Sequence, residues 1–408
     1  HAYRMMDQLY ENRDLAQQMV RHASTQLVGG HVDVCFFDVT TLYFESFEQD
    51  ELRDFGYSKD QKFHQTQVVL ALATTDNALP IGYKLFHGAQ AEITTLIECL
   101  NAWKQQGLQI GHVTFVADRG MMTRENLAML EKENCTYIVG AKLRKLPAKM
   151  QQQILDTTQY RAAELASEPT WVREFSFENR RLICSYSPSR ARKDASDRER
   201  IVKKLTKKLG KKTKASSVKT ARQRKQTPDS NDPQAQGCTQ KLISNRGYLK
   251  YIQVQGRSTA TLNEEKIERD KQWDGMHGVI TNCDLPELET LARYRELWTI
   301  EEAFRIHKHD LKMRPIYHFT PRRIEAHVAI CFLAYALVRH AQHIIRLRKK
   351  RMSVEVMRNE LLSVQASILR DTRTQGLYKL PSRMSQRAKD IYAAFDLKRS
   401  LKPSQVMI

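Results

Sequence analysis

Three side chains that could act on a phosphate share one spacing near the end of the chain. Tyr294, Glu301 and Lys308 each lie seven residues apart, within a segment, 294–312, that contains no Pro or Gly. Seven residues fall about 20° short of two helical turns, so a helix here would carry a hydroxyl, a carboxylate and an ammonium along one face. That row could hold a metal ion and a phosphate together. A solvated helix with ordinary i,i+4 charge pairs is the alternative that this segment alone leaves open.

Two further carboxylates lie in apolar runs far from that segment. Asp38 lies inside the run 34–45, and Asp118 ends the apolar part of 113–120. Short β-branched and aromatic runs are typical of buried strands, where an ionised Asp is costly unless a positive group pairs with it. For Asp118 alone, a strand-end residue that caps a turn is an open alternative. Together with Glu301, the two aspartates would make an oxygen-rich site of the kind that Mg²⁺ or Mn²⁺ prefers.

These residues resemble the DDE transposases of bacterial insertion sequences, in the group with a Tyr-x2-Arg-x3-Glu-x6-Lys motif. Tyr294, Glu301 and Lys308 occupy the tyrosine, glutamate and lysine positions at the family's spacing, whereas Leu297 stands at the arginine position. The neighbouring sequences LW-x-IEE-x-FR and RPIYH also resemble this group. The resemblance extends over residues 32–347, with three motifs in the family's order.

The resemblance implies an α/β fold, in which an RNase H-like catalytic domain has a mixed sheet flanked by helices. A β-rich basic insertion would interrupt this domain before the helix that carries Glu301, and the N- and C-terminal parts would be helical. With Asp38 inside one strand and Asp118 at the carboxyl end of another, the two would meet where open α/β sheets keep their ligands. In the first catalytic part we expect strands over 34–45, 67–74, 80–87, 113–117 and 136–142, and helices over 92–106 and 124–134.

The family also implies roles for individual residues. Asp38, Asp118 and Glu301 would be catalytic and would ligate Mg²⁺ (or Mn²⁺), with two ions about 4 Å apart suited to phosphodiester chemistry. We expect further residues to contact DNA or its phosphates, namely Tyr294, Arg305 and Lys308 near the scissile bond, and Arg119, Lys59 and Trp273. For Lys59, which lies in the loop 56–60, a solvent loop is an open alternative. Trp273 could stack on a displaced base, and a packing role is its alternative.

We expect the chain to be divided into parts with different compositions. They are a helical N-terminal segment over 1–30, catalytic core over 31–144, an insertion over 145–290, further core over 291–347 and a helical C-terminal region over 348–408. The N-terminal segment has three open roles: DNA contact, dimerisation or packing. Because the chain opens with His1 and not Met, we expect this segment to be incomplete. In the last part, a helix over 352–370 is expected.

The insertion contains a strongly basic segment, 190–225, with 16 Lys or Arg residues against 3 acids. Such a density of like charge repels itself unless it is solvated or neutralised. One interpretation is a DNA-binding segment whose affinity depends steeply on salt. A disordered, solvated linker is the alternative, and part of the segment has the apolar spacing of a helix.

The composition of the whole chain bounds its partners and its compartment. Its 408 residues carry a net charge of +20, which favours a polyanionic partner such as nucleic acid over an unspecific basic surface. The seven cysteines include no CxxC, which favours thiols in a reducing compartment over a disulfide framework or a zinc site. We expect no signal peptide, and we expect the apolar run 328–338 to be too short to span a bilayer. We therefore expect a bacterial, cytoplasmic, nucleoid-associated protein without a membrane partner.

Three functions remain open from the residues. The first is a DNA transposase that cuts phosphodiester bonds at inverted-repeat ends and transfers the 3′-hydroxyl to target DNA. The resemblance adds DNA, both transposon ends and target, as the partner, and a homodimer in the synaptic complex. The second function is an RNase H-like DNA-binding protein that has lost catalysis, which the departure at Leu297 favours. The third is a nuclease without strand transfer.

Overall fold

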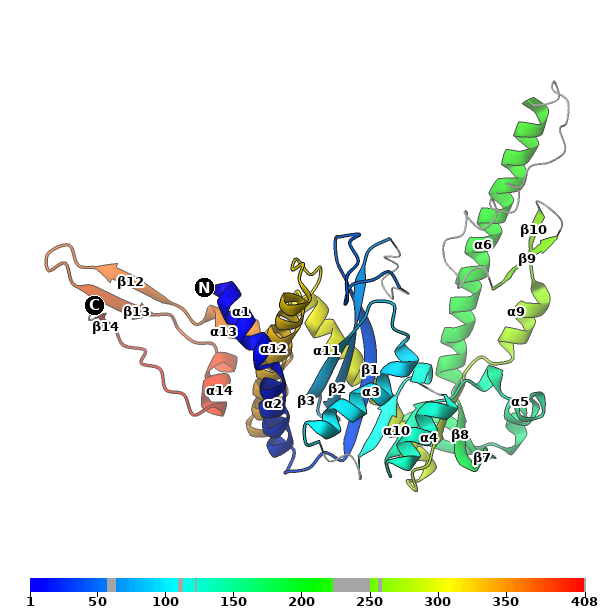
Figure 1. Cartoon of the computed structure of the whole chain (residues 1–408), viewed down its shortest axis with the longest axis horizontal. Helices are drawn as coiled ribbons and strands as arrows, with labels where there is room; N and C mark the ends of the chain where they lie inside the picture. The colour runs from blue at the N-terminus through cyan, green and yellow to red at the C-terminus, as the bar shows by residue number, and fades with distance from the viewer. Residues whose placement is uncertain (57–63, 109–112, 122, 223–249, 256–258, 407–408) are drawn as a thin grey trace. The chain divides into compact units, whose positions relative to one another are not determined.

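The apolar runs between residues 34 and 142 form a mixed sheet in the computed structural model of the chain (Figure 1). The strands lie in the order β3-β2-β1-β4-β5 and are β1 (Val34–Tyr43), β2 (Gln67–Thr75), β3 (Pro80–Phe86), β4 (Thr114–Ala117) and β5 (Thr136–Gly140). β1 pairs antiparallel with β2, and β2 with β3, whereas β4 runs parallel to β1 and to β5. This mixed α/β arrangement is consistent with the RNase H-like transposase fold expected from the sequence.

The structure describes residues 1–56, 64–108, 113–121, 123–222, 250–255 and 259–406. The chain divides into two compact units. Unit 1 comprises residues 1–140 and 293–408, and unit 2 comprises residues 141–292. The predicted insertion, 145–290, falls within unit 2, while the boundaries of the five predicted parts stay predictions.

Helices cover the sheet of unit 1 and bury its central strands. Every residue of β2 is buried, and Asp38 is the partly exposed position in an otherwise buried run from Val34 to Leu42. α11 packs against β1 and β2 (Figure 1). The helices of this unit are α1 (Ala2–Glu11), α2 (Arg13–Leu27), α3 (Glu92–Gln105), the 3-10 turn η1 (Arg119–Met121), α4 (Arg124–Lys132), α11 (Trp298–Arg305) and α12 (Pro321–Arg348), with α10 (Glu287–Arg295) entering it from unit 2.

α12 is the long core helix of unit 1. It packs against α1, α2 and β3 and buries Phe332 and Tyr335. By length and composition alone α12 could cross a membrane. Half of its most apolar stretch, however, is buried inside the protein. Core helices pass the same test of length and composition.

The segment predicted as one helix over 294–312 is broken in the structure. α10 ends at Arg295, residues 296–297 form a turn, α11 follows, and the π-helix η5 (Ile306–Asp310) carries Lys308. The turn lets Leu297 bury its side chain while Trp298 stays half exposed. The prediction of a single uninterrupted helix was therefore wrong, because an amphipathic pattern records which side chains are buried and does not report a local change of pitch.

Unit 2 contains an antiparallel sheet ordered β11-β8-β7-β6. Its two-residue turns, Ala166–Ser167 and Glu178–Asn179, have positive φ at both positions, which matches the twist of tight hairpins. Its strands are β6 (Arg161–Leu165), β7 (Glu168–Phe177), β8 (Arg180–Tyr186) and β11 (Met276–Thr281), and β9 (Ile252–Gln255) pairs separately with β10 (Thr259–Leu262). Its helices are the 3-10 turns η2 (Leu143–Lys145) and η3 (Thr157–Gln159), α5 (Ala148–Leu155), the long α6 (Pro188–Arg222) and α9 (Glu264–Lys271).

The C-terminal region is only partly helical, so the prediction for residues 348–408 was wrong in part. α13 (Val354–Ser363) and α14 (Gln386–Ala394) form, but β12 (Ala366–Arg370), β13 (Leu377–Pro381) and β14 (Ser404–Val406) make a small antiparallel sheet. The helix expected over 352–370 stops at Ser363. β12 is exposed at every position, so burial gave its sequence no period-two pattern to detect.

Candidate active site

The register of the parallel strands brings Asp38 and Asp118 together. Phe37 of β1 lies opposite Ala117 of β4, so the next residue on each strand, Asp38 and Asp118, falls at the same level. Neighbouring strands lie about 4.8 Å apart, and side chains at one level of a parallel pair point to the same face. Asp38 is partly buried, with one carboxylate oxygen accepting from the amide of Val39 at 2.7 Å, and Asp118 is exposed.

The same level continues to Gly140 at the end of β5, where Tyr294 is seated. Ala117 lies opposite Val139, so Asp118 and Gly140 are also neighbours. The Tyr294 hydroxyl donates to the Asp118 carboxylate at 3.3 Å, and it occupies the space that a Cβ at position 140 would need. Glycine at this position therefore lets the tyrosine reach the aspartate.

Lys308 makes a second contact to the same face of the sheet. Its ammonium donates to the Thr40 hydroxyl at 2.5 Å. Thr40 lies two residues beyond Asp38 on β1, and residues two apart on a strand point to one face. Glu301 lies seven residues from Tyr294 and seven from Lys308, between these two points of attachment. The broken helix thus lies over the two aspartates, although its three predicted residues do not share one regular helix.

Glu301 itself has no partner within the part of the chain that the structure describes. Its side chain is exposed and makes no hydrogen bond or ion pair there. Its neighbour Glu302 pairs instead with Arg339 of α12 at 2.8 Å, and the guanidinium of Arg339 is almost fully buried. That ion pair holds α11 against the core, while the preceding residue, Glu301, lies on the outer surface.

The carboxylates fit a divalent cation by chemistry and only in part by position. Hard oxygen donors at Asp38 and Asp118 lie at one level, as a shared Mg²⁺ site requires. Among the described residues, however, no group of three His, Cys, Asp or Glu side chains is close enough to hold a metal ion. Glu301 therefore does not complete a preassembled cluster, and its assignment as the third ligand stays a prediction.

The π-helix that carries Lys308 is packed through a neutral histidine. His307 is almost completely buried, its ring lies 4.4 Å from that of Tyr335, and its Nδ1 is 2.9 Å from the Ala303 carbonyl. Burial lowers the pKa of His307 to about 4, because the charged ring would lose its hydration. The imidazole is uncharged at neutral pH and adds no charge beside Lys308.

The other predicted DNA contacts differ in exposure. Arg119 directly follows Asp118 and is exposed, and Arg305 is exposed while it pairs with Glu302 at 3.3 Å. Both side chains are therefore accessible to solvent. Lys59 lies outside the described residues. At the arginine position of the motif, Leu297 is buried and packs as an apolar residue.

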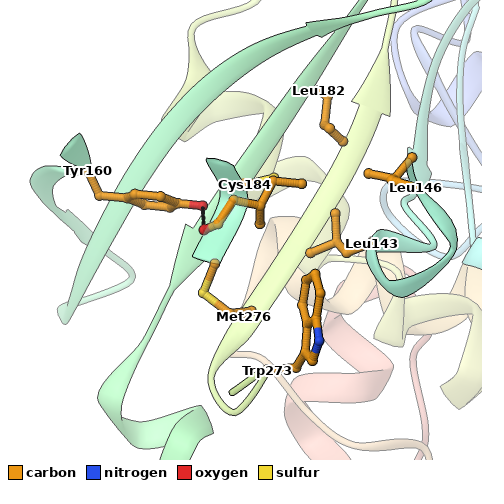
Figure 2. Close-up of a cluster of buried hydrophobic side chains, with 8 residues drawn as sticks. Leu143, Leu146, Tyr160, Leu182, Cys184, Trp273 and Met276 are labelled. Carbon is orange, nitrogen blue, oxygen red and sulfur yellow. Dashed lines mark hydrogen bonds between the residues drawn. The ribbon is translucent and has the colours of Figure 1, made fainter. Parts of the chain in front are cut away.

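Trp273 is a packing residue of unit 2. Its indole is 6% exposed and belongs to a buried cluster with Leu143, Leu182 and Met276. Figure 2 shows the indole beside Leu143, inside that cluster. The packing alternative thus accounts for Trp273, and the stacking of a displaced base on it is not carried further because the ring surface is already occupied by side chains.

The chain that forms this site was compared with known protein families. The transposase DDE domain family matches residues 32–337, which is most of the chain. The chain belongs to this family. The matched region of this DDE domain contains Asp38, Asp118, Tyr294, Glu301 and Lys308.

Two other comparisons complete the findings. No curated protein matches the sequence of this DDE domain protein. A solved structure, the piggyBac transposase synaptic complex with hairpin DNA determined by cryo-electron microscopy, is similar with a TM-score of 0.41 and 7% identity. The match covers 80% of this chain and 51% of that chain, so this chain spans about half of the length of that transposase.

Sequence reasoning missed three residues that position this site: Thr40, Gly140 and Arg339. Gly140 ends an apolar run that was correctly predicted as a strand, and a glycine there signals close approach of another group. Thr40 could have been found from its spacing of two from Asp38. Arg339 had a signal as well, since an arginine directly after the apolar run 328–338 of a core helix requires a partner if it is buried.

Proposed function

We propose that this chain is a DNA transposase that cuts phosphodiester bonds at the inverted-repeat ends of a transposon and joins the 3′-hydroxyl to target DNA. Its family supports DNA transposition. The observation that carries the chemistry is the strand register that sets Asp38 beside Asp118, with the Glu301 segment attached over them through Tyr294 and Lys308. The catalytic residues in this proposal are Asp38, Asp118 and Glu301.

In this proposal the three carboxylates hold divalent cations, Mg²⁺ or Mn²⁺, and two ions are expected. Bound there, the ions would activate a water or a 3′-hydroxyl and stabilise the leaving oxygen. Glu301 is free to turn toward the aspartates, since its side chain is exposed and has no partner among the described residues. DNA that crosses this face would bring phosphate and Glu301 to the same place.

The cations and the tyrosine have separate roles. The Lys308 ammonium, already at Thr40 on the face of Asp38, would hold a nonbridging phosphate oxygen. Tyr294 orients the Asp118 carboxylate through its hydrogen bond and acts as a positioning residue. Arg305 and Arg119 are exposed and would neutralise neighbouring phosphates.

The biological setting follows from the same proposal. We place the protein in the bacterial cytoplasm with the nucleoid, as the product of an insertion sequence, and we expect two copies in the synaptic complex. The net charge of +20 supports contact with transposon ends and with target DNA.

A DNA-binding protein without catalysis is the second candidate. It is favoured by the buried Leu297 at the arginine position and by the lack of a three-carboxylate cluster among the described residues. A nuclease without strand transfer would keep the carboxylates and lack joining. The three functions differ in two measurable steps, cleavage and joining.

The test uses the full chain and a supercoiled plasmid that carries the genomic sequences flanking the gene, with Mg²⁺ or Mn²⁺. The transposase proposal expects cleavage at the ends and joined products, both lost in Glu301→Gln. Glu125→Gln is the matched control, because Glu125 is also an exposed acid in the first turn of a helix. Joining that survives Glu301→Gln would remove this residue from the site. Binding without cleavage would establish the second function, and cleavage without joining the third.

A further inference from the structure

The long helix α6 of unit 2 has two faces with different surroundings. One face carries Ile201 and Leu205, which pack in a small cluster with Tyr251 and Ile267. Leu205 is completely buried there. The other face is exposed, and it carries most of the cations of the described part of the helix. Because both faces belong to one helix, the packing of the apolar face fixes the direction in which the exposed face points.

Asp274 and Gly275, of the sequence Trp-Asp-Gly, bind the packed face of α6 near the N-terminus of the helix. The Asp274 carboxylate accepts hydrogen bonds from both terminal nitrogens of Arg198, one of them at 2.6 Å. This bidentate ion pair is largely buried. The amide of Gly275 donates to the Asp194 carboxylate at 3.1 Å. Gly275 has a φ of +77°, and a Cβ there would clash with the Ser187 carbonyl and Ala191. The first turns of α6 are therefore held in a fixed orientation on unit 2.

The exposed face carries a stripe of cations, here called the α6 stripe. At 100° per residue its members centre on the side opposite Arg198 and Leu205. On that side Ser196 and Thr206 are the uncharged exposed residues and Glu199 is an exposed acid at its edge, so no apolar side chain interrupts the described stripe. The α6 stripe consists of Arg192, Lys193, Arg200, Lys203, Lys204 and Lys207.

Most of the stripe is not neutralised by neighbouring acids. Arg200 pairs with Asp197 at 2.7 Å, but within the described residues Lys203, Lys204 and Lys207 form no ion pair. These lysines lie three or four residues from Arg200 or from one another, which is the spacing at which like charges destabilise a helix. The sequence of α6 beyond Lys207 adds Lys208, Lys211, Lys212, Lys214, Lys219 and Arg222 and no acid.

A second helix of the same unit shows the contrasting pattern. α9 also exposes several cations, but they alternate with acids: Arg269 pairs with Glu265 at 2.7 Å, and Lys271 pairs with Glu268 at 3.4 Å. Two of its exposed cations are therefore neutralised by acids of the same helix. The unpaired charge of α6 is therefore not a general property of exposed helices in unit 2.

We propose that the α6 stripe binds the sugar-phosphate backbone of duplex DNA, outside the active site. Between Arg192 and Lys207 the helix rises about 22 Å, which matches about six base pairs along a strand. Phosphates would relieve the repulsion among the lysines, and the lack of apolar side chains on the stripe gives a bilayer nothing to bury. The inference rests on the proposed function in that DNA is the partner.

The test compares the full chain with two triple variants. Lys203→Gln/Lys204→Gln/Lys207→Gln removes three unpaired cations of the stripe, and Lys266→Gln/Arg269→Gln/Lys271→Gln removes three cations of α9 as the matched control. Binding of a fluorescent 40-base-pair duplex is measured by anisotropy over a series of salt concentrations, and circular dichroism checks that each variant is folded.

The slope of log K against log salt should fall by about 0.9 for each phosphate that the protein no longer neutralises. We expect the stripe variant to lose about two to three units of slope and the α9 variant to lose less than about one. An unchanged slope in the stripe variant would overturn the proposal. Equal losses in both variants would do so too, because net charge alone would then explain binding. Loss of binding to vesicles of anionic phospholipid, with DNA binding intact, would assign the stripe to a membrane surface.

Two further measurements separate this inference from the proposed function. Asp118→Asn should bind the duplex with the slope of the unmodified chain while cutting nothing. The stripe variant should still cut DNA at low salt and saturating DNA. If the unmodified chain binds through the stripe but never cuts, the inference stands and the proposed catalysis fails.

Discussion

The two aspartates and the glutamate of the candidate active site are held in place by different kinds of structure. Asp38 and Asp118 are positioned by the backbone pairing of β1 with β4. Glu301 lies on a segment attached by side chains, through Tyr294 to Asp118, Lys308 to Thr40, and Glu302 to Arg339. A strand register cannot slip by one residue without turning buried side chains outward, whereas each side-chain interaction can break by itself.

Only one half of the site is therefore preformed. The aspartate pair exists once the sheet has folded. The glutamate depends on a segment with a turn at 296–297 and a π-helix at 306–310, both of which interrupt regular helix geometry. Single substitutions should separate the two halves, because a change in the sheet and a change in the attached segment disturb different carboxylates.

The sharpest separation is expected in metal binding. Asp118→Asn should weaken Mn²⁺ binding by about a hundredfold or more, because it removes half of the preformed pair. Glu301→Gln should weaken it by only about tenfold while abolishing strand joining. Isothermal titration with Mn²⁺ gives the affinities, and plasmid assays give the joining. Equal losses of affinity would show that the glutamate is as preformed as the aspartates.

The glutamate segment should be sensitive to acid through His307. Burial lowers the pKa of this imidazole to about 4, against about 6.5 in the unfolded chain. Between these values the unfolded state binds the proton and the folded state does not, so stability present above pH 6.5 is lost as pH falls toward 4. We expect up to about 3 kcal/mol from this group. Urea unfolding at pH 7.5, 6 and 5 should show a flatter dependence in His307→Gln, with His22→Gln, an exposed histidine, as the control.

At Gly140 the sheet that carries the aspartates contacts Tyr294 of the segment that carries Glu301. In Gly140→Ala the new methyl group would meet the Tyr294 hydroxyl and the backbone of Arg119. We expect a loss of stability of about 1–3 kcal/mol from this overpacking, together with slower cleavage. Thermal unfolding measures the loss. Gly120→Ala is the matched control, because a methyl group there meets open space. A Gly140→Ala protein as stable as the control would contradict the seating of Tyr294.

Glu302 is contacted from two sides, which gives a controlled test of how α11 is anchored. Arg339→Met removes a buried partner and should lower the free energy of unfolding by about 2 kcal/mol. Arg305→Met removes an exposed partner of the same carboxylate and should cost less than about 1 kcal/mol. Urea unfolding of both variants decides between them. If the costs are equal, the buried contact does not hold the segment.

Tyr294→Phe should have the mildest consequence. It removes one hydrogen bond of 3.3 Å to Asp118 and leaves the ring in place. At about 1 kcal/mol, the loss should slow cleavage about fivefold. A positioning role predicts that kcat falls while KM for DNA changes little, and single-turnover and steady-state assays together give both values. A large rise in KM would instead make Tyr294 a direct contact of DNA.

Part of the candidate site, the two aspartates, could be predicted from the sequence for a physical reason. Asp38 and Asp118 could be recognised because a carboxylate inside or at the end of an apolar run conflicts with burial. Their strands were predicted within a few residues, from β1 to β5, because buried strands leave long β-branched and aromatic runs. The exposed β12 left no such pattern, and the turn at 296–297 was hidden because the apolar spacing continues across it.

The role of Trp273, in contrast, could not be predicted from the sequence. A tryptophan beside Asp-Gly gave no indication of whether its ring would face solvent or core, and the structure buries it beside Leu143. The neighbouring Asp274 also could not be assigned from the sequence, since its partner Arg198 lies 76 residues earlier.

The sequence alone showed the spacing of Tyr294, Glu301 and Lys308 and the basic character of the segment that forms α6. Its apolar runs predicted the strands that carry the aspartates, and the resemblance of its motifs to a known family indicated the family. The folded chain was needed to show that Asp38, Asp118 and Gly140 share one level and that Tyr294 and Lys308 attach to that face. It was needed as well to place the cations of α6 opposite its packed side. Those facts depend on strand register and on long-range side-chain contacts, which neighbouring residues in the chain do not encode.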